Sequence, residues 1–294
     1  MTDKHASRIE LFNSTLAILR QGWFISSSGN KIELPSVEEV MGAAVMYSEQ
    51  KGVIIDPIEP ITTEVRVENK DCVLAAQELI DAGFNPAMLN LADLYTPGGL
   101  VEYGSGAQEE NLCRRSNLIL SLYQFSHARV HQYPDLGLVQ RLDQYPMDER
   151  FGGVYSGIVS FFRGPESKGS MLEDKVYNIP VISVAAISGP RIGADGMMSP
   201  AEAAITLDKM RTIFRIGLMQ GHDSLVLSAM GCGAFSNPPA HIAKLFHQVM
   251  DEDEFKDKFK LIEFAILDGY RTGMWHNPDG NYPPFKREFE TYGC

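Results

Sequence analysis

A glycine-rich segment between an apolar run and a helical pattern occupies residues 90–115 of this chain. The apolar run at Pro86–Ala92 has the length of a buried strand. Two clusters of small residues follow, at 97–99 and 104–107, before polar residues open a helix at Gln108. A strand, a glycine loop and a helix start, in this order, point backbone N–H groups at an anionic ligand. The segment therefore predicts a phosphate-type binding loop at the end of a strand.

Two adjacent carboxylates, Glu109 and Glu110, stand at the start of that helix. Acidic residues are favoured there by the helix macrodipole, which is a purely structural explanation. The alternative is functional, because the two carboxylates place an acid/base pair beside the predicted phosphate cradle. Adjacent helical residues point about 100° apart, so the two side chains are expected to have different tasks.

Strand and helix patterns alternate after residue 52, which predicts an α/β fold with a mixed sheet. The strand patterns occupy 53–56, 62–67, 154–163, 175–186, 224–230 and 260–268, and the main helix patterns 72–82, 199–220 and 240–250. Residues 1–51 differ, because they carry a helical pattern at 8–21 and a capping box at Ser36 that predicts a second helix to about residue 50. We interpret residues 1–51 as a helical accessory segment and residues 52–294 as the main domain.

The charge of the chain restricts its partners. The formal net charge is −12 over 294 residues, whereas non-specific binding to nucleic acid requires a basic surface. A small phosphate-bearing ligand is still compatible, because backbone amides bind anions without net positive charge. No apolar run approaches the roughly 20 residues that span a bilayer, and the polar start lacks a secretory apolar region. We therefore expect no membrane partner.

The cysteines give no indication of a metal or disulfide framework. Cys72, Cys113, Cys232 and Cys294 are scattered without CxxC spacing, so a structural zinc site is not predicted. A reducing cytoplasm fits this usage best. His127 and His131 have helical spacing, but no third ligand accompanies them, and we predict no metal site.

A second glycine loop, Gly231-Cys232-Gly233-Ala234-Phe235, follows the apolar strand at 224–230. Loops at the carboxyl ends of neighbouring strands flank one crevice in an open α/β sheet, and two such loops suit a diphosphate. Neither loop matches the P-loop or dinucleotide-binding fingerprints. The structural alternative is a tight turn with Phe235 in the core. Cys232 with His241 also suggests a thiol nucleophile, although a buried small residue is the simpler reading.

Several motifs occur here in a fixed order. An Asn90-containing strand end and Pro97 precede Gly98-Gly99-Leu100; seven residues then lead to Gln108-Glu109-Glu110, and the second glycine loop follows much later. In this order they resemble the microbial poly(ADP-ribose) glycohydrolases, a branch of the macrodomain fold. The resemblance implies a macrodomain-like three-layer α/β/α sandwich with a mixed sheet, an N-terminal helical extension and a catalytic domain over 52–294. It implies ADP-ribose or an ADP-ribosylated protein or polymer as partner, and no cofactor.

The resemblance also implies a role for each site residue. Glu110 is the acid that protonates the leaving oxygen and later the base for the attacking water, as glycosidases require. Glu109 orients ribose hydroxyls. The remaining ligand-binding residues are Asn90, Asp93, Gly98, Gly99, Gln108, Gly231, Cys232, Gly233, Ala234 and Phe235. Of these, the glycine loops hold the diphosphate, Phe235 packs on the distal ribose, and Gln108 braces the loop or binds a ribose hydroxyl.

Two positions depart from the family pattern. Leu100 replaces the third glycine, and Asp93 stands where the family often has Ser or Asn. These departures leave two alternatives to polymer cleavage. One is a non-catalytic ADP-ribose-binding module, and the other is a hydrolase of a different mono-ADP-ribosyl linkage.

Overall fold

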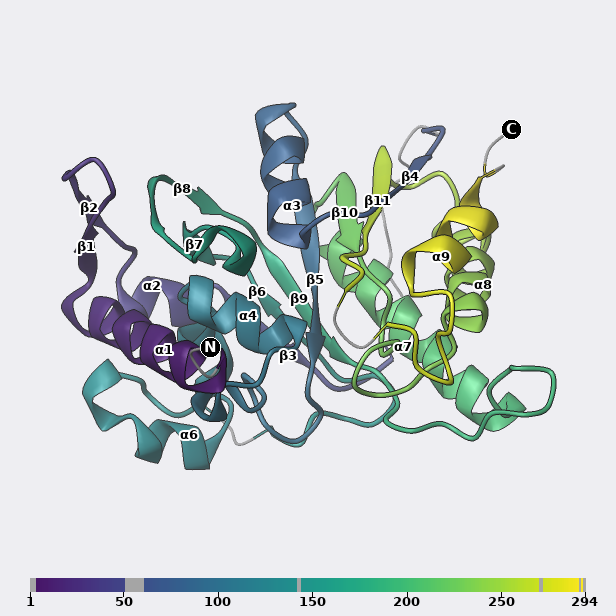
Figure 1. Ribbon diagram of the computed structural model, residues 1–294, viewed down its shortest axis with the longest axis horizontal. Helices are drawn as coiled ribbons and strands as arrows, with labels where there is room; N and C mark the ends of the chain where they lie inside the picture. The colour runs from purple at the N-terminus through teal and green to yellow at the C-terminus, as the bar shows by residue number, and fades with distance from the viewer. Residues whose placement is uncertain (1–3, 51–60, 142–143, 270–271, 291, 293–294) are drawn as a thin grey trace.

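A computed structural model of the chain describes residues 4–50, 61–141, 144–269, 272–290 and 292. Its centre is a seven-stranded mixed sheet between two layers of helices (Figure 1). The strand order is β3 (Ala44–Tyr47), β6 (Gly153–Ser156), β9 (Val181–Ala185), β5 (Pro86–Ala92), β10 (Ser224–Leu227), β11 (Leu261–Ala265) and β4 (Glu64–Glu68). β6 is antiparallel to β3 and to β9, and the five strands from β9 to β4 run parallel.

The five inner strands of the sheet are buried on both faces, which requires helices on both sides of the sheet. In β9, Val181 and Ala185 belong to one buried cluster, and the alternate residues Ile182 and Val184 to the other. The first cluster packs under α1 (Lys4–Gln21), α2 (Val37–Gly42), α3 (Cys72–Asp81), α4 (Gln108–Arg115) and α5 (Leu118–Tyr123); the second packs under α7 (Pro200–Met219), α8 (Pro239–Met250) and α9 (Tyr282–Phe289). The three-layer α/β/α architecture is confirmed.

Smaller elements surround these layers. They are the ribbon of β1 (Trp23–Ile25) and β2 (Lys31–Glu33), the ribbon of β7 (Ser160–Arg163) and β8 (Leu172–Asn178), the helix α6 (His127–Gln132), and the 3-10 turns Val101–Tyr103, Pro134–Leu136 and Glu166–Lys168. The capping box at Ser36 is confirmed, since its hydroxyl accepts from the Glu39 amide and the Glu39 carboxylate accepts from the Ser36 amide. The helix that it begins was predicted to reach residue 50, and this was wrong: it ends at Gly42, because residues 44–47 pair with β6.

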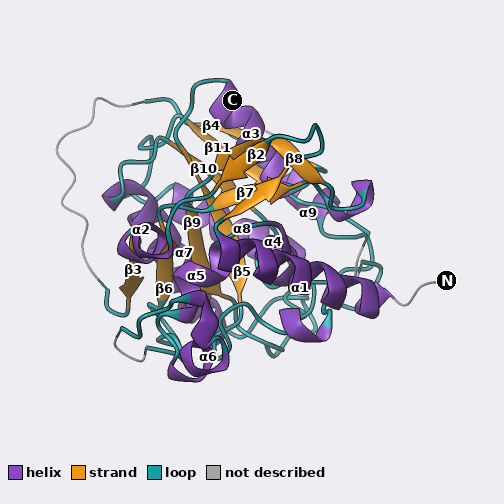
Figure 2. Cartoon of the chain, turned by 90° about the vertical axis from the view of Figure 1, so that its left-hand side faces the viewer, coloured by secondary structure: helices purple, strands orange, loops and turns teal. Residues whose placement is uncertain are grey.

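The N-terminal segment shares its core with the rest of the protein. Helix α1 lies against α4 and the turn at Val101–Tyr103 (Figure 2). The hydroxyl of Thr15 donates to the carbonyl of Arg114 over 2.6 Å, and Leu16 packs in the same buried cluster as Leu112. β3 is an edge strand of the central sheet. Residues 4–50 therefore share a hydrogen bond, a buried cluster and the central sheet with later residues. The division into an accessory segment over 1–51 and a main domain over 52–294 stays a prediction. The strand predicted at 53–56 lies outside the described residues.

None of the described helices has both the length and the apolar composition needed to cross a bilayer.

Candidate active site

Three loops leave the same edge of the sheet. β5 is parallel to both β9 and β10, so the connections after all three strands start at this carboxyl edge. The chain after β5 enters α4 on one face, whereas the chain after β9 and β10 enters α7 and α8 on the other. Ligands of open α/β sheets bind where successive connections diverge to opposite faces. Both predicted glycine loops lie at this point.

The carboxylate of Glu109 is held by groups from β5 and from the first loop. Register pairs Asn90 with Ser183, and both side chains face α4. The Asn90 amide donates to the Ser183 hydroxyl over 3.0 Å and to Oε1 of Glu109 over 3.3 Å. The backbone amides of Gly98 and Asp93 donate to Oε1 and Oε2 over 3.1 and 2.7 Å. Glu109 is only 2% exposed, so these bonds fix its carboxylate between strand and loop.

Burial dominates the proton affinity of Glu109. Desolvation raises its pKa to about 8, because an ionised carboxylate is poorly solvated inside the protein. The hydrogen bond from the Asp93 amide opposes this rise, and the negative charge of Glu110 adds to it. A glutamic acid in this setting holds its proton near neutral pH.

Glu110 presents one bound and one unbound carboxylate oxygen. Its Oε1 accepts from the backbone amide of Leu100 over 3.0 Å. Its Oε2 is buried and has no hydrogen-bond partner among the described residues. A Cβ at Gly99 would lie 2.4 Å from Oε1 of Glu110 and 3.3 Å from Oε2 of Glu109. Both carboxylates thus converge beneath Gly99, although their side chains leave the helix in different directions.

The first loop uses its amides internally, which differs from the expected diphosphate cradle. Gly98 donates to Glu109, Leu100 donates to Glu110, and Gly99 donates to the Thr96 carbonyl over 2.9 Å. The absence of a side chain at Gly99 lets the loop approach the carboxylates closely, with a φ of 57°. In this structure the first loop positions the two acids. The side chain of Leu100 is 54% exposed and points away from that packing.

Gln108 and Asp93 also make bonds within the protein. β10 pairs only with the first part of β5, so the backbone of Leu89 and Leu91 on that side is open to side chains. The Gln108 amide donates to the Leu89 carbonyl over 3.0 Å and accepts from the Leu91 amide over 2.7 Å. Oδ1 of Asp93 accepts from the amides of Tyr95 and Thr96. Gln108 therefore fastens α4 to the sheet, and Asp93 shapes the turn after β5.

The second loop has the free amides that the first lacks. The Asn237 amide donates to the carbonyls of Ile187, Gly231 and Phe235 over 2.7, 3.1 and 3.2 Å, and so sets the loop's shape. The backbone amides of the Gly233–Phe235 stretch have no acceptor among the described residues. A Cβ at Gly233 would meet no atom within 4 Å. This loop presents donors to open space and suits an anionic ligand.

Cys232 has a structural position. Its thiol is buried, and burial raises its pKa well above the usual value, so it does not form a thiolate nucleophile. The ring of His241 accepts from the Met198 amide instead of pairing with this thiol. The Cys232 carbonyl contacts His276 Nε2 at 2.8 Å and accepts from the Asn277 amide at 3.2 Å. These two contacts were not predicted from the sequence.

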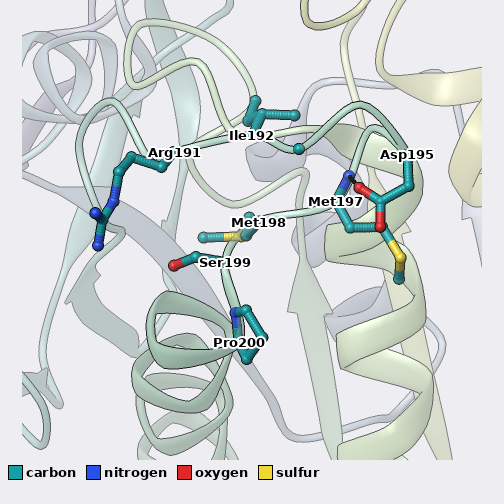
Figure 3. Close-up of a pocket in the computed structure, with 8 residues that line it drawn as sticks. Arg191, Ile192, Asp195, Met197, Met198, Ser199 and Pro200 are labelled. Atoms are coloured by element: carbon teal, nitrogen blue, oxygen red, sulfur yellow. Dashed lines mark hydrogen bonds between the residues drawn. The ribbon is translucent and has the colours of Figure 1, made fainter.

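A hairpin between β9 and α7 forms a pocket of about 410 Å³ beside the second loop (Figure 3). The Gly193 amide closes the hairpin on the Met197 carbonyl over 2.8 Å, and the Gly189 amide ties its base to the Phe235 carbonyl over 2.9 Å. Arg191 lies at one end of the pocket and Asp195 at the other. The sequence indicated only a loop here. Within the described residues, no cluster of three or more His, Cys, Asp or Glu side chains is arranged to hold a metal ion.

Comparisons with known proteins agree with this geometry. The family model "Microbial-type PARG, catalytic domain" matches residues 13–164, which include both carboxylates and the first loop. No curated protein sequence matches the chain. Among solved structures, the poly(ADP-ribose) glycohydrolase of Thermomonospora curvata is similar, with a TM-score of 0.77 and 26% identity over 97% of this chain and 100% of that one.

Two further solved structures contain ligands of the relatives. The Thermomonospora curvata enzyme bound to the inhibitor ADP-HPD has a TM-score of 0.74 and 25% identity, over 97% of this chain and 100% of that one. The Deinococcus radiodurans enzyme in complex with ADP-ribose has a TM-score of 0.64 and 23% identity, over 90% of this chain and 100% of that one. At that identity, the Deinococcus likeness is one of fold.

Proposed function

The chain belongs to the microbial-type poly(ADP-ribose) glycohydrolase family, and on this premise we propose that Glu110 is the residue that releases ADP-ribose from the polymer. The protein is a glycoside hydrolase that acts on poly(ADP-ribose). One observation carries the assignment of Glu110: its Oε2 is buried at the carboxyl edge of the sheet and has no hydrogen-bond partner among the residues that the structure describes, while Oε1 is held by the Leu100 amide. A held carboxyl group with one free oxygen is suited to move a proton.

In this mechanism Oε2 of Glu110 gives its proton to the oxygen that links two riboses. The bond from that oxygen to the anomeric carbon breaks through an oxocarbenium-like state. The resulting carboxylate then takes a proton from water, whose hydroxyl bonds to the anomeric carbon and frees ADP-ribose. Glu109 orients a ribose hydroxyl and braces the loop. Because its pKa is raised to about 8, Glu109 stays mostly protonated near neutral pH. It therefore places no negative charge beside Glu110.

The diphosphate of the substrate binds at the second loop. The amides of the Gly233–Phe235 stretch support this placement, because none of them donates to a described residue. Phe235 packs against the distal ribose. Gly98 and Gly99 do not bind the diphosphate directly. Their loop lies at the same edge of the sheet and holds the two glutamates in place.

Substitution of Glu110 by Gln tests the assignment. The polymer and a mono-ADP-ribosylated protein are incubated in parallel, and released ADP-ribose is measured by chromatography. Glu110→Gln removes the transferable proton and keeps the shape, so release should fall by about 10³-fold or more while ADP-ribose still binds. Glu149→Gln, an exposed substitution at the same edge, is the matched control. Turnover by Glu110→Gln at the control rate would refute the role of Glu110.

We propose a cytoplasmic location because of the state of the cysteines. Cys72, Cys113 and Cys232 are free thiols, which suits a reducing cytoplasm.

In the parallel assay, cleavage of polymer without cleavage of the mono-ADP-ribosylated protein would define the acceptor linkage as ribose–ribose.

A further inference from the structure

Arg129 reaches the active-site loop from a different element. It lies on α6, is 6% exposed, and extends its guanidinium over the ring of Tyr123, 5.1 Å from the ring centroid. Its Nη2 donates to the carbonyl oxygen of Gly99 over 3.1 Å. This is a charge-assisted hydrogen bond to the glycine that lies over both carboxylates.

The bond acts on the same peptide unit that holds Glu110. The carbonyl of Gly99 and the N–H of Leu100 belong to one planar peptide and point in opposite directions. Arg129 binds the carbonyl end at 3.1 Å, and Oε1 of Glu110 binds the N–H end at 3.0 Å. The peptide therefore connects a guanidinium on one side to the proposed catalytic carboxyl group on the other.

Arg129 is itself fixed in place. Its Nη1 forms an ion pair with Glu102 and donates to the Gln132 side chain over 2.8 Å. The hydroxyl of Tyr133 donates to the same Glu102 oxygen over 2.5 Å. Glu102 lies in the 3-10 turn directly after the glycine loop. The guanidinium thus has a defined orientation toward the Gly99 carbonyl.

We propose that Arg129 is a positioning residue for the glycohydrolase reaction, because it holds the Gly99–Leu100 peptide with its N–H directed at Glu110. The proposal rests on the proposed role of Glu110. Gly99 has a positive φ and no side chain, so its following peptide can rotate unless something retains it. Arg129 retains it and polarises it, which strengthens the N–H as a donor. That donor fixes Oε1 of Glu110 and keeps the other carboxyl oxygen in place for proton transfer.

Other charges around Glu110 come from three elements. Glu109 and Arg114 lie on its own helix, and each interacts electrostatically with Glu110. Asp93 of the loop after β5 acts on Glu109. Glu102 lies beyond the loop, paired with Arg129. Of the charged groups in the described part of the chain, only Arg129 is linked to Glu110 through a shared peptide, so its removal should alter Glu110 while the other charges stay in place.

Arg129→Met and Arg129→Lys test the proposal, with Arg215→Met as the matched control. Arg215 is also buried, pairs with Glu254 and lies over an aromatic ring, but on α7 across the sheet. The kcat and the KM for polymer are measured for each variant at neutral pH. Thermal unfolding confirms that each variant is folded.

Arg129→Met should lower kcat by about 10- to 100-fold with little change in KM. Arg129→Lys should recover part of the lost kcat, since an ammonium can also bind the Gly99 carbonyl. Arg215→Met should leave kcat unchanged. A folded Arg129→Met with the wild-type kcat would overturn the proposal, as would an equal loss of kcat in a folded Arg215→Met. Turnover by Glu110→Gln would instead refute the role of Glu110 itself.

Discussion

The side-chain amide of Asn90 donates to Oε1 of Glu109 over 3.3 Å, from a strand to the first turn of a helix 19 residues later. The same amide nitrogen donates to the Ser183 hydroxyl of the adjacent strand β9. Asn90 is completely buried, so its amide joins two strands and α4 at the base of the site. Its identity as a donor follows from this geometry, because Glu109 offers only acceptors when ionised.

Asn90→Asp should therefore impair the enzyme. It replaces the amide donor with an acceptor, so Oε1 of Glu109 and the Ser183 hydroxyl both lose a hydrogen bond in a buried site. We expect kcat for polymer to fall by about 100-fold. Asn117→Asp is a control of equal burial, since Asn117 uses its Oδ1 to accept from the Ser160 amide and an aspartate preserves that bond. Steady-state kinetics with wild-type kcat in Asn90→Asp would contradict this account.

Gly99→Ala should displace the catalytic acid. The added Cβ would stand 2.4 Å from Oε1 of Glu110, at a backbone φ of 57°. Gly83→Ala provides the control, because Gly83 has a φ of 86° and no atom within 4 Å of the added Cβ. Both variants acquire the strain of a left-handed alanine, about 1 kcal/mol. Only Gly99→Ala should lose turnover, by about 100-fold or more in a polymer assay. Equal activity in the two variants would mean that Gly99 matters only for the backbone conformation and not for the position of Glu110.

Gly233→Ala tests the second loop as the diphosphate site. Its Cβ would meet no protein atom within 4 Å, so the thermal unfolding temperature should not change. A ligand bound against the loop amides would meet that methyl group, and we expect ADP-ribose to bind about tenfold more weakly in calorimetry. Gly42→Ala in α2, which also has open space, should leave the affinity unchanged. Unaltered affinity in Gly233→Ala would place the diphosphate elsewhere.

Glu109→Gln should change how stability depends on pH. In the folded protein the pKa of Glu109 is raised from 4.5 to about 8. Below the lower value both states hold the proton. Between the two values the unfolded chain ionises and the folded protein does not, so the free energy of unfolding falls as pH rises and levels off above the folded value. Gln cannot ionise, so the variant should lack this loss, which we expect to be about 5 kcal/mol.

Urea denaturation from pH 4.5 to pH 9 measures this difference. The stability of Glu109→Gln relative to wild type should increase across that range. Glu10→Gln, on the exposed side of α1, is the control and should track the wild type. A constant difference between Glu109→Gln and wild type would show that burial does not raise the pKa of Glu109.

The layered fold was predictable because it depends on local patterns. Alternating strand and helix patterns indicated the α/β class, and two glycine loops after strands indicated one sheet edge as the candidate site. The order of Gln108, Glu109 and Glu110 behind Gly98 and Gly99 indicated the family, which the family model confirmed. The helix predicted to residue 50 was wrong because pairing of 44–47 with β6 outweighed local helical preference.

The sequence by itself determined the order of strands, loops and acids along the chain, because periodicity and turn residues are local properties. Only the tertiary structure decided which backbone N–H groups of the two glycine loops donate hydrogen bonds within the protein. In the first loop the N–H groups of Gly98 and Leu100 donate to Glu109 and Glu110, whereas the N–H groups of Gly233–Phe235 in the second loop donate to no described residue. It also brought Arg129 to the Gly99 carbonyl. Such pairings join residues on separate elements, and their distances follow from sheet register and helix packing, which spacing along the chain does not encode.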